Sequence, residues 1–352
     1  MFKKYISGIL FVVFMAYVPL FVFDKLDAKG EGGGSYTGVL NLWHIETFEG
    51  GRGSRAEFLK KRAIEFESKN KGVFVSVQTY TLQQVEEKLK QGDNFDLISF
   101  SFGVGCKVKE LLSPFTGQIN VRDDLLAGGV FDGVVLALPW AFGGYTLCCF
   151  DDILAKKGGK LSLQNAFGFG YTKKDKNKTK VPSLAVGFAQ YTNPMQLLAD
   201  CGAKGVADEW QNDLSVTPYQ AYQSFVQRDY ALLLGTQRDL SRVLVKQSQG
   251  KMTDVTFEFL GGYTDLVQYI GFCDNKDRGA LSQAFAQYLT SDHSQKKLAG
   301  IGMFSPSLDI YSDGLQDKME KALSSDLKVP CVFDDEQKLQ QAKQKAMEIV
   351  GI

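Results

Sequence analysis

The first hundred residues alternate between two spacings of apolar side chains, and this alternation constrains the fold more than any other feature. Gly38–Trp43 and Asp96–Phe100 are short apolar runs, and β-branched residues alternate in Val73–Tyr80, as in strands. Residues 55–69 and 82–91 carry apolar residues at helical spacing. The order strand, helix, strand, helix, strand predicts an α/β fold with a parallel sheet and right-handed crossovers.

The predicted helices have recognisable first and last turns. Ser54 and Glu57 fit a capping box, in which the serine caps the helix and the glutamate bonds back to the cap. Thr81 is placed to cap the second helix. Gly72 and Gly92 follow the two helices and are expected to end them.

A second α/β region follows, and 352 residues are enough for two lobes, since domains tend to have about 100–200 residues. Two strands, Val134–Trp140 and Gly144–Phe150, have Pro139 and Gly143 at or between their ends, which suits a bend. The later elements expected are a helix opening at Thr217–Pro218, a strand at Asp229–Leu234, a helix capped by Thr236 and running through Val245, a strand at Val255–Leu260, and helical stretches at Lys276–Ala299 and Asp334–Val350.

The N-terminus predicts export. Lys3 and Lys4 precede an apolar stretch, Tyr5–Phe23, that exceeds the ~7–15 residues of a signal-peptide core and approaches the ~20 that span a bilayer. We therefore expect residues 1–28 to be an uncleaved anchor with the body outside, and residues 29–36 to be a flexible tether. Cleavage after a weak site ending at Ala28 is the alternative. No cysteine lies near this segment, which excludes lipid attachment to a cysteine.

Charge and motifs argue against several function classes. With 40 basic and 40 acidic residues the net charge is 0, so a nucleic-acid partner is not expected. Residues 51–56 fit G-x-G-x-x-A, but the first glycine does not follow the preceding strand directly, because residues 45–49 intervene, so they do not form a dinucleotide site. His44 and His293 each lack a second ligand at metal spacing, and no G-x-S-x-G elbow occurs. We expect neither a cofactor nor a metal.

Six cysteines are present, none in a C-x-x-C pair. Export would permit disulfides, but spacing does not fix any pairing. Cys148 and Cys149 are neighbours in a predicted strand, so their side chains point to opposite faces and do not bond to each other. We interpret the cysteines as buried thiols.

Four stretches of the chain, in order, carry a family resemblance. They are the strand, loop and helix of residues 38–70, NFDLISFSFG at 94–103, LALPWAFGGYTLCCF at 136–150, and AFAQYLTSDHSQKKLAGIGMFSPS at 284–307. In sequence and spacing they resemble the extracellular solute-binding proteins of ABC importers, in the carbohydrate-binding group related to maltose-binding protein. The absence of a lipobox cysteine and the loose match of GTQRDLSRV at 235–243 are departures.

The resemblance implies a type II periplasmic-binding-protein fold, in which two lobes enclose a ligand cleft at a hinge. It places lobe one at 37–141 plus 270–303 and lobe two at 146–262 plus 311–352. The hinge crossings are then near 141–146, 262–269 and 304–311. Clefts at the carboxyl ends of strands are also where open α/β sheets bind ligands in general.

The best candidate for a binding segment is the loop after the first strand, which holds Trp43, Glu46 and Thr47 just before a helix. In a sugar site, carboxylates accept hydrogen bonds from hydroxyls, and aromatic rings pack on the C–H face. The alternative is that Trp43 belongs to the core and Glu46 only favours the helix dipole. The other candidates, which follow strands or flank crossings, are Ser101, Phe102, Trp140, Tyr145, Tyr191, Arg238 and Tyr263, with Trp210 as a further stacking platform.

We expect a binding protein and not an enzyme: a monomer that captures a mono- or oligosaccharide by hinge closure and delivers it to an ABC permease. Two alternatives stay open. A membrane-anchored glycan hydrolase would use a pair of carboxylates such as Glu46 and Glu49. A ligand-sensing subunit of a signalling system would use the same two-lobed body.

Overall fold

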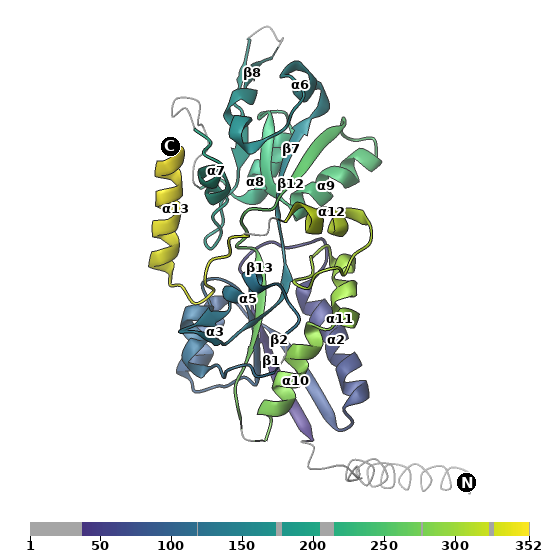
Figure 1. The fold of residues 1–352 in the computed structure, drawn as a ribbon, viewed down its shortest axis with the longest axis vertical. Helices are drawn as coiled ribbons and strands as arrows, with labels where there is room; N and C mark the ends of the chain where they lie inside the picture. Colours follow the sequence, from purple (N-terminus) through teal and green to yellow (C-terminus); the bar gives the residue numbers. More distant parts are fainter. Residues whose placement is uncertain are drawn as a thin grey trace, which may run out of the picture.

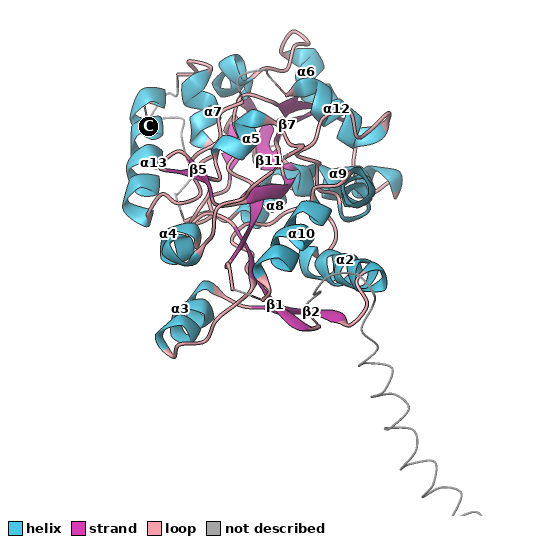
Figure 2. Cartoon of the chain, turned by 60° about the horizontal axis from the view of Figure 1, so that its bottom comes forward, coloured by secondary structure: helices cyan, strands magenta, loops and turns pink. Residues whose placement is uncertain are grey.

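The computed structural model describes residues 37–117, 119–173, 178–204, 215–275, 277–323 and 327–351. The anchor and tether predicted for residues 1–36, and the candidate Trp210, lie outside them. The chain forms two lobes, one above the other in Figure 1, each built on its own sheet. Figure 2 shows that helices surround the strands of both lobes. None of the described helices is both long enough and apolar enough to cross a membrane.

The first sheet has five strands in the order β2-β1-β3-β13-β6. β1 pairs in parallel with both β2 and β3, as the alternation predicts, whereas β13 runs antiparallel to β3 and β6. Helices α2 and α3 lie on opposite sides of this sheet in Figure 1. The bounds are β1 Gly38–His44, β2 Val73–Thr79, β3 Leu97–Phe100, β6 Leu138–Phe142, β13 Val267–Phe272, α2 Arg55–Lys69, α3 Leu82–Lys90 and α10 Gly279–Leu289.

The helix starts in this lobe largely follow the sequence. Ser54 Oγ accepts from the Glu57 amide at 3.2 Å, so the predicted cap is confirmed. The return bond of the capping box was predicted wrongly: the Glu57 carboxylate instead pairs with Lys60 Nζ at 2.7 Å, a partner one helical turn along. Thr81 and Gln84 form a complete capping box.

The second sheet has four strands in the order β10-β11-β7-β12. β10 and β11 are parallel, and β7 runs antiparallel to both β11 and β12. Thr217 caps α8 with proline in its first turn, and Thr236 caps α9, as predicted. The bounds are β7 Tyr145–Phe150, β10 Leu184–Val186, β11 Leu232–Thr236, β12 Val255–Leu260, α8 Pro218–Val226 and α9 Gln237–Ser248.

Several segments connect the lobes. β6 leads into β7 through Gly143 and Gly144, and β12 leads into β13 through residues 261–266. A third segment begins where Phe304 and Phe142 exchange backbone hydrogen bonds of 2.9 and 3.1 Å. It leads to α12, Gly314–Ala322, which packs on β12. The lobe boundaries given above, residue by residue, stay predictions.

The C-terminal segment contacts lobe one before it returns to lobe two. Val332 is not part of a strand, but its backbone amide donates a hydrogen bond to Gly128 O at 2.8 Å. The ring of the next residue, Phe333, lies 6.2 Å from the ring of Phe100 in lobe one. After this contact α13, Glu336–Val350, packs against α7, Met195–Asp200, in lobe two. The chain therefore touches both lobes again after α12.

Two predicted elements are subdivided. The run 134–140 does not form one strand, because Leu136 turns back to bond Gly129 O and leaves β5 in a hairpin with β4. The helical stretch 276–299 breaks at Thr290, whose hydroxyl bonds to Gln287 O. The remaining short elements are α4 Gly105–Val108, η1 Lys109–Leu111, α5 Asp123–Ala127, β4 Val130–Phe131, β5 Val134–Val135, α6 Asp151–Lys156, η2 Leu163–Phe169, β8 Tyr171–Thr172, β9 Lys180–Val181, α11 Asp292–Gln295 and η4 Lys296–Ile301.

All six cysteines are free thiols. Cys148 and Cys149 lie buried in β7, where burial raises the pKa of each thiol to about 12. These thiols act as small apolar groups of the core, as expected.

Candidate functional site

The loop after β1 holds Glu46 between two buried donors. Its carboxylate accepts from His44 Nε2 at 3.0 Å and pairs with Arg55 Nη2 at 3.3 Å. Partial burial raises the pKa of this carboxyl group, but the His44 hydrogen bond and the Arg55 charge outweigh burial and bring its pKa to about 2. Glu46 is therefore ionised, 39% exposed, and already engaged on the side facing the protein.

His44 also links Glu46 to Ser99. Because an ionised carboxylate only accepts, His44 Nε2 carries the proton and Nδ1 accepts from Ser99 Oγ at 3.0 Å. Trp140 Nε1 and Gln268 Nε2 donate to the same hydroxyl at 3.0 and 3.1 Å. Burial lowers the pKa of His44. Although the order serine, histidine, carboxylate resembles a catalytic triad, Ser99 and His44 are fully buried, so this serine cannot meet a solute in this conformation.

Ion pairs join the two lobes across their interface. Glu49 of lobe one pairs with Arg238 at 3.2 Å and with Arg242 at 3.1 Å, both from α9 of lobe two. Arg238 also donates to Gly51 O at 3.3 Å. We call Glu49, Arg238 and Arg242 the Glu49 cluster. Asp239, which is buried and holds Arg242 at 2.8 Å, fixes the cluster to the start of α9.

Little space is left behind this cluster. The gap between Phe48 and Glu49 on one side and Thr236 and Asp239 on the other is about 20 Å³, room for roughly one water molecule. At Gly103 of lobe one, an added Cβ would lie 2.4 Å from the ring of Tyr191 in lobe two. The lobes are therefore in direct contact along this side.

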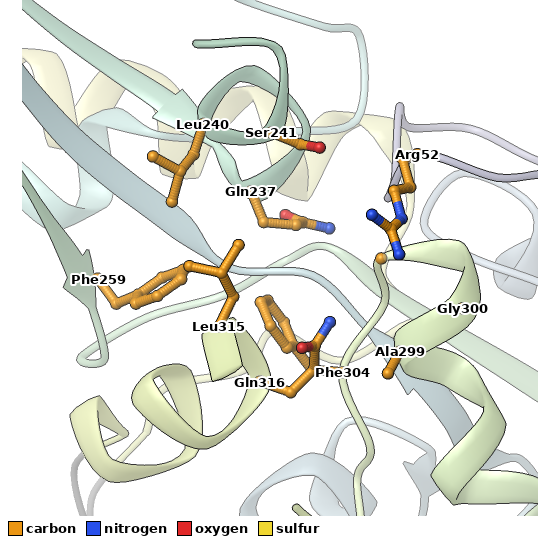
Figure 3. A pocket seen from close by; sticks show the side chains of 11 residues that line it. Arg52, Gln237, Leu240, Ser241, Phe259, Ala299, Gly300, Phe304, Leu315 and Gln316 are labelled. Atoms are coloured by element: carbon orange, nitrogen blue, oxygen red, sulfur yellow. The ribbon is translucent and has the colours of Figure 1, made fainter. Parts of the chain in front are cut away.

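A larger cavity of about 290 Å³ opens between the lobes next to the Glu49 cluster (Figure 3). We call it the interlobe cavity. Lobe one, α9 and β12 of lobe two, and the segment leading to α12 all contribute to its wall. The lining residues are Arg52, Gln237, Leu240, Ser241, Phe259, Ala299, Gly300, Gly302, Phe304, Leu315 and Gln316.

Gln237 stands at the centre of this cavity in Figure 3 and is 5% exposed. Its Oε1 accepts from the Gly144 amide at 3.0 Å, which fixes the orientation of the side-chain amide. The one acceptor that its Nε2 meets among the described residues is the thioether of Met303, at 3.6 Å. Because a thioether is a weak acceptor, this N–H group retains donor capacity toward the cavity.

Two predicted aromatic residues belong to the hinge instead. Tyr145 and Tyr263 donate to the carboxylate of Asp265 at 2.7 and 3.0 Å, and the Asn193 amide donates to it as well. Burial raises the pKa of Asp265, against the effect of these donors. The four residues tie the second crossing to β7 and to the loop before α7.

Four further candidates lie in the core. Trp43 packs against Tyr80 and Phe95 with ring centroids 5.4 and 5.3 Å apart, and Trp140 stacks on Phe58 at 5.5 Å. The other two are Ser101, whose hydroxyl donates to Val267 O at 2.7 Å, and Phe102, which is 1% exposed. Burial favours the structural interpretation of these four residues.

Two of the last three candidates lie at the boundary between the lobes, and the third, Thr47, lies in the loop after β1. Tyr191 and Arg238 face lobe one, as described above. Thr47 has a buried hydroxyl that meets no hydrogen-bond partner among the described residues. Contact of any predicted residue with a ligand stays a prediction.

None of the residues predicted to bind a ligand lines the interlobe cavity, so sequence reasoning missed its lining. Gln237 and Ser241 are four residues apart in a helix whose start, at Thr236, was recognised, so they share one face. That spacing was the available signal. Over the ranges that the structure describes, no three His, Cys, Asp or Glu side chains converge as metal ligands.

No family model matches the sequence, and no curated protein sequence is similar to it. Solved structures, in contrast, match over nearly the whole chain. The GacH receptor of Streptomyces glaucescens, solved unliganded and with acarbose, is 12% identical with a TM-score of 0.63, and the match covers 90% of this chain and 94% of that one. The sugar-binding protein MalE from Xanthomonas citri is 14% identical with a TM-score of 0.61, and the match covers 89% and 97%.

An enzyme shares the fold: thiaminase I from Bacillus thiaminolyticus is 13% identical with a TM-score of 0.61, and the match covers 89% of this chain and 100% of that one. The chain therefore has the type II periplasmic-binding-protein fold of the sugar-binding ABC substrate-binding proteins, which confirms the expected fold class. Fold and cavity together give a two-lobed body with a cavity of about 290 Å³ between its lobes.

Proposed function

We propose that this chain is the extracellular substrate-binding component of an ABC importer, which captures a small solute, a sugar, by hinge closure and delivers it to a membrane permease. The interlobe cavity carries the proposal. Arg52 comes from lobe one, Gln237 and Ser241 from lobe two, and Phe304 from a connecting segment. A solute in this cavity contacts both lobes, so its binding favours the arrangement in which the lobes meet.

Known proteins of this fold support a sugar ligand. Besides the GacH receptor with acarbose, a substrate-binding protein from Listeria monocytogenes is solved with cycloalternan, and one from Thermotoga lettingae with α-D-tagatose. The apolar side of the cavity, with Phe259 and Phe304, suits the C–H face of a sugar ring.

The proposal includes no bond making or breaking. Glycoside hydrolysis needs two separated carboxyl groups beside the scissile bond, and no Asp or Glu is among the residues that line the cavity. Ser99 and His44 are enclosed in the core. These observations favour binding over the hydrolase alternative, although thiaminase I shows that the fold also serves catalysis.

Location and partners complete the proposal. The basic and apolar N-terminus, residues 1–28, would export the chain and hold the lobes at the outer face of the cytoplasmic membrane. The body would work as a monomer beside its permease, since one chain supplies every wall of the cavity.

A thermal-shift screen of the full chain against mono- and oligosaccharides, amino acids and polyamines tests the proposal. A solute at a hundred times its dissociation constant adds about 2.7 kcal/mol of stability, which raises the melting temperature measurably. We expect one sugar class to give this shift. A shift with a different solute class alone would retain the binding role and refute the sugar assignment, and recovery of a cleaved sugar would favour the hydrolase.

A further inference from the structure

Resting on the proposed function, we infer that the interlobe cavity binds a monosaccharide-sized sugar acid, a hexuronate, whose carboxylate contacts Arg52. The inference rests on four properties of the cavity: its size, its charge, its hydrogen-bond donors and its apolar wall.

The size favours one sugar ring. At about 290 Å³, the cavity is at the lower end of the ~300–1,000 Å³ typical of small-molecule sites. The space next to it, behind the Glu49 cluster, is only about 20 Å³ and does not extend it. A linear oligosaccharide would need the lobes to move apart, whereas a single ring fits the arrangement described.

The charge favours an anion. Arg52 is the charged residue in the lining, and within the described part of the chain no carboxylate lies within ion-pairing distance of its guanidinium. The nearby Glu49 is already shared by Arg238 and Arg242. Arg52 is exposed, and its guanidinium presents a planar fork of donors that matches a carboxylate, so it is free to pair with the carboxylate of a ligand.

Among the described residues, the remaining polar groups of the lining also meet no strong acceptor. The Gln237 amide is fixed with its N–H group free for a ligand, and Ser241 and Gln316 add a hydroxyl and a second amide. A neutral sugar, whose hydroxyls all need acceptors when they donate, is usually met by carboxylates. A lining of one cation and neutral groups instead matches a ligand that brings its own negative charge and some hydroxyls.

The apolar wall accounts for the sugar ring. Leu240 and Leu315 face the cavity together with Phe259 and Phe304, whose rings meet edge to face at 5.9 Å. In Figure 3 these side chains gather on the side away from Arg52. A ring with one carboxylate end and one C–H face would satisfy both sides of the cavity, while a small acyclic acid would leave the wall uncovered.

Calorimetric titration of the full chain with D-glucuronate, D-galacturonate and D-mannuronate, each beside its neutral hexose, tests the inference. We expect at least one uronate to bind at least tenfold more tightly than its hexose and than succinate, a non-sugar acid. Arg52→Gln should weaken binding of that uronate by about tenfold to a hundredfold, because a charge-assisted pair is lost, and weaken hexose binding by a smaller factor.

Lys60→Gln, which removes the same charge from the exposed face of α2, is the matched control and should leave uronate binding unchanged. Melting curves of each variant establish that it is folded. Equal affinity for uronate and hexose, equal affinity for succinate, or an unaltered uronate affinity in Arg52→Gln would overturn the inference. Binding of neutral sugars with none of the three uronates would overturn it and leave the proposed function standing, whereas no binding across the wider solute panel would overturn both.

Discussion

At the scale of single residues, the first loop shows how burial decides what a polar side chain can do. Glu46, His44 and Ser99 form a continuous line of hydrogen bonds, yet only Glu46 reaches the surface. Arg55, 1% exposed, depends on Glu46 for its charge partner and on Phe48 O for a further acceptor at 2.6 Å. The role that this geometry supports for Glu46 is to neutralise a buried cation.

Glu46→Gln should therefore destabilise the fold by roughly 1–2 kcal/mol near neutral pH, a value reduced for the partial exposure of the carboxylate. The pKa of Glu46 is lowered from 4.5 to about 2 in the folded chain, so its contribution is complete above pH 4.5 and disappears as pH falls toward 2. Urea unfolding of both proteins should show their difference shrinking over that range. Glu57→Gln, at an exposed carboxylate, is the control, and an equal loss in both variants would contradict the account.

At the scale of elements, the local signals were sufficient for the caps of several helices and for the parallel pairing of β1 with β2 and β3. The caps at Thr81, Thr217 and Thr236 were predictable because a side-chain hydroxyl and the amides of its own first turn decide them. The subdivision at Leu136 was not predictable, because it depends on a hydrogen bond to the backbone of Gly129 in another segment. The break at Thr290 was not predictable either, because it depends on a turn hydrogen bond to Gln287 O.

The hinge cluster around Asp265 is also decided by remote contacts. Tyr145, on β7, donates to the carboxylate of Asp265, which lies 120 positions later in the chain. No local sequence pattern predicts this hydrogen bond. Tyr145 and Tyr263 were recognised as residues that flank crossings, but their hydroxyls face a buried protein group rather than the interlobe cavity.

Tyr145→Phe should destabilise the fold by about 1.5–3 kcal/mol, because it removes a buried donor from an acceptor that stays buried. Chemical denaturation measures this loss. Tyr219→Phe, at a tyrosine that is 47% exposed, should change stability by less than about 0.5 kcal/mol. If both variants were equally stable, the Asp265 cluster would not hold the hinge as described.

At the scale of the whole molecule, the order of strands and helices along the chain predicted an α/β fold with a second α/β region, and the family resemblance implied two lobes that face each other. Composition could not show which aromatic residues the helices cover: Trp43 and Trp140 were plausible in a cleft and lie in the core. The polar contacts across the interface, Glu49 with Arg238 and Arg242, join segments about 190 positions apart, and only the packed lobes bring them together.

Direct contact between the lobes should be sensitive to one methyl group at Gly103. Its φ is +85°, and a Cβ there would lie 2.4 Å from Tyr191 of the other lobe, so Gly103→Ala should hold the lobes apart. Small-angle X-ray scattering should show a larger radius of gyration. Gly92→Ala, with φ +82° and no atom within 4 Å of the added Cβ, carries the same backbone strain and should keep the wild-type dimensions.

The double variant Gly103→Ala, Tyr191→Ala removes the ring that the methyl group would meet. It should return the radius of gyration toward the wild-type value. An expanded particle in Gly92→Ala, or none in Gly103→Ala, would mean that the lobes do not meet at this point in solution.

The central claim is that one chain holds one small solute between its lobes and releases it unchanged. Native mass spectrometry of the full chain, incubated with the solute panel, tests it most directly. The account predicts a monomer carrying a single adduct whose mass equals that of the intact sugar or sugar acid, and release of the same mass on unfolding. The absence of an adduct with every solute, or release of a fragment of lower mass, would contradict it.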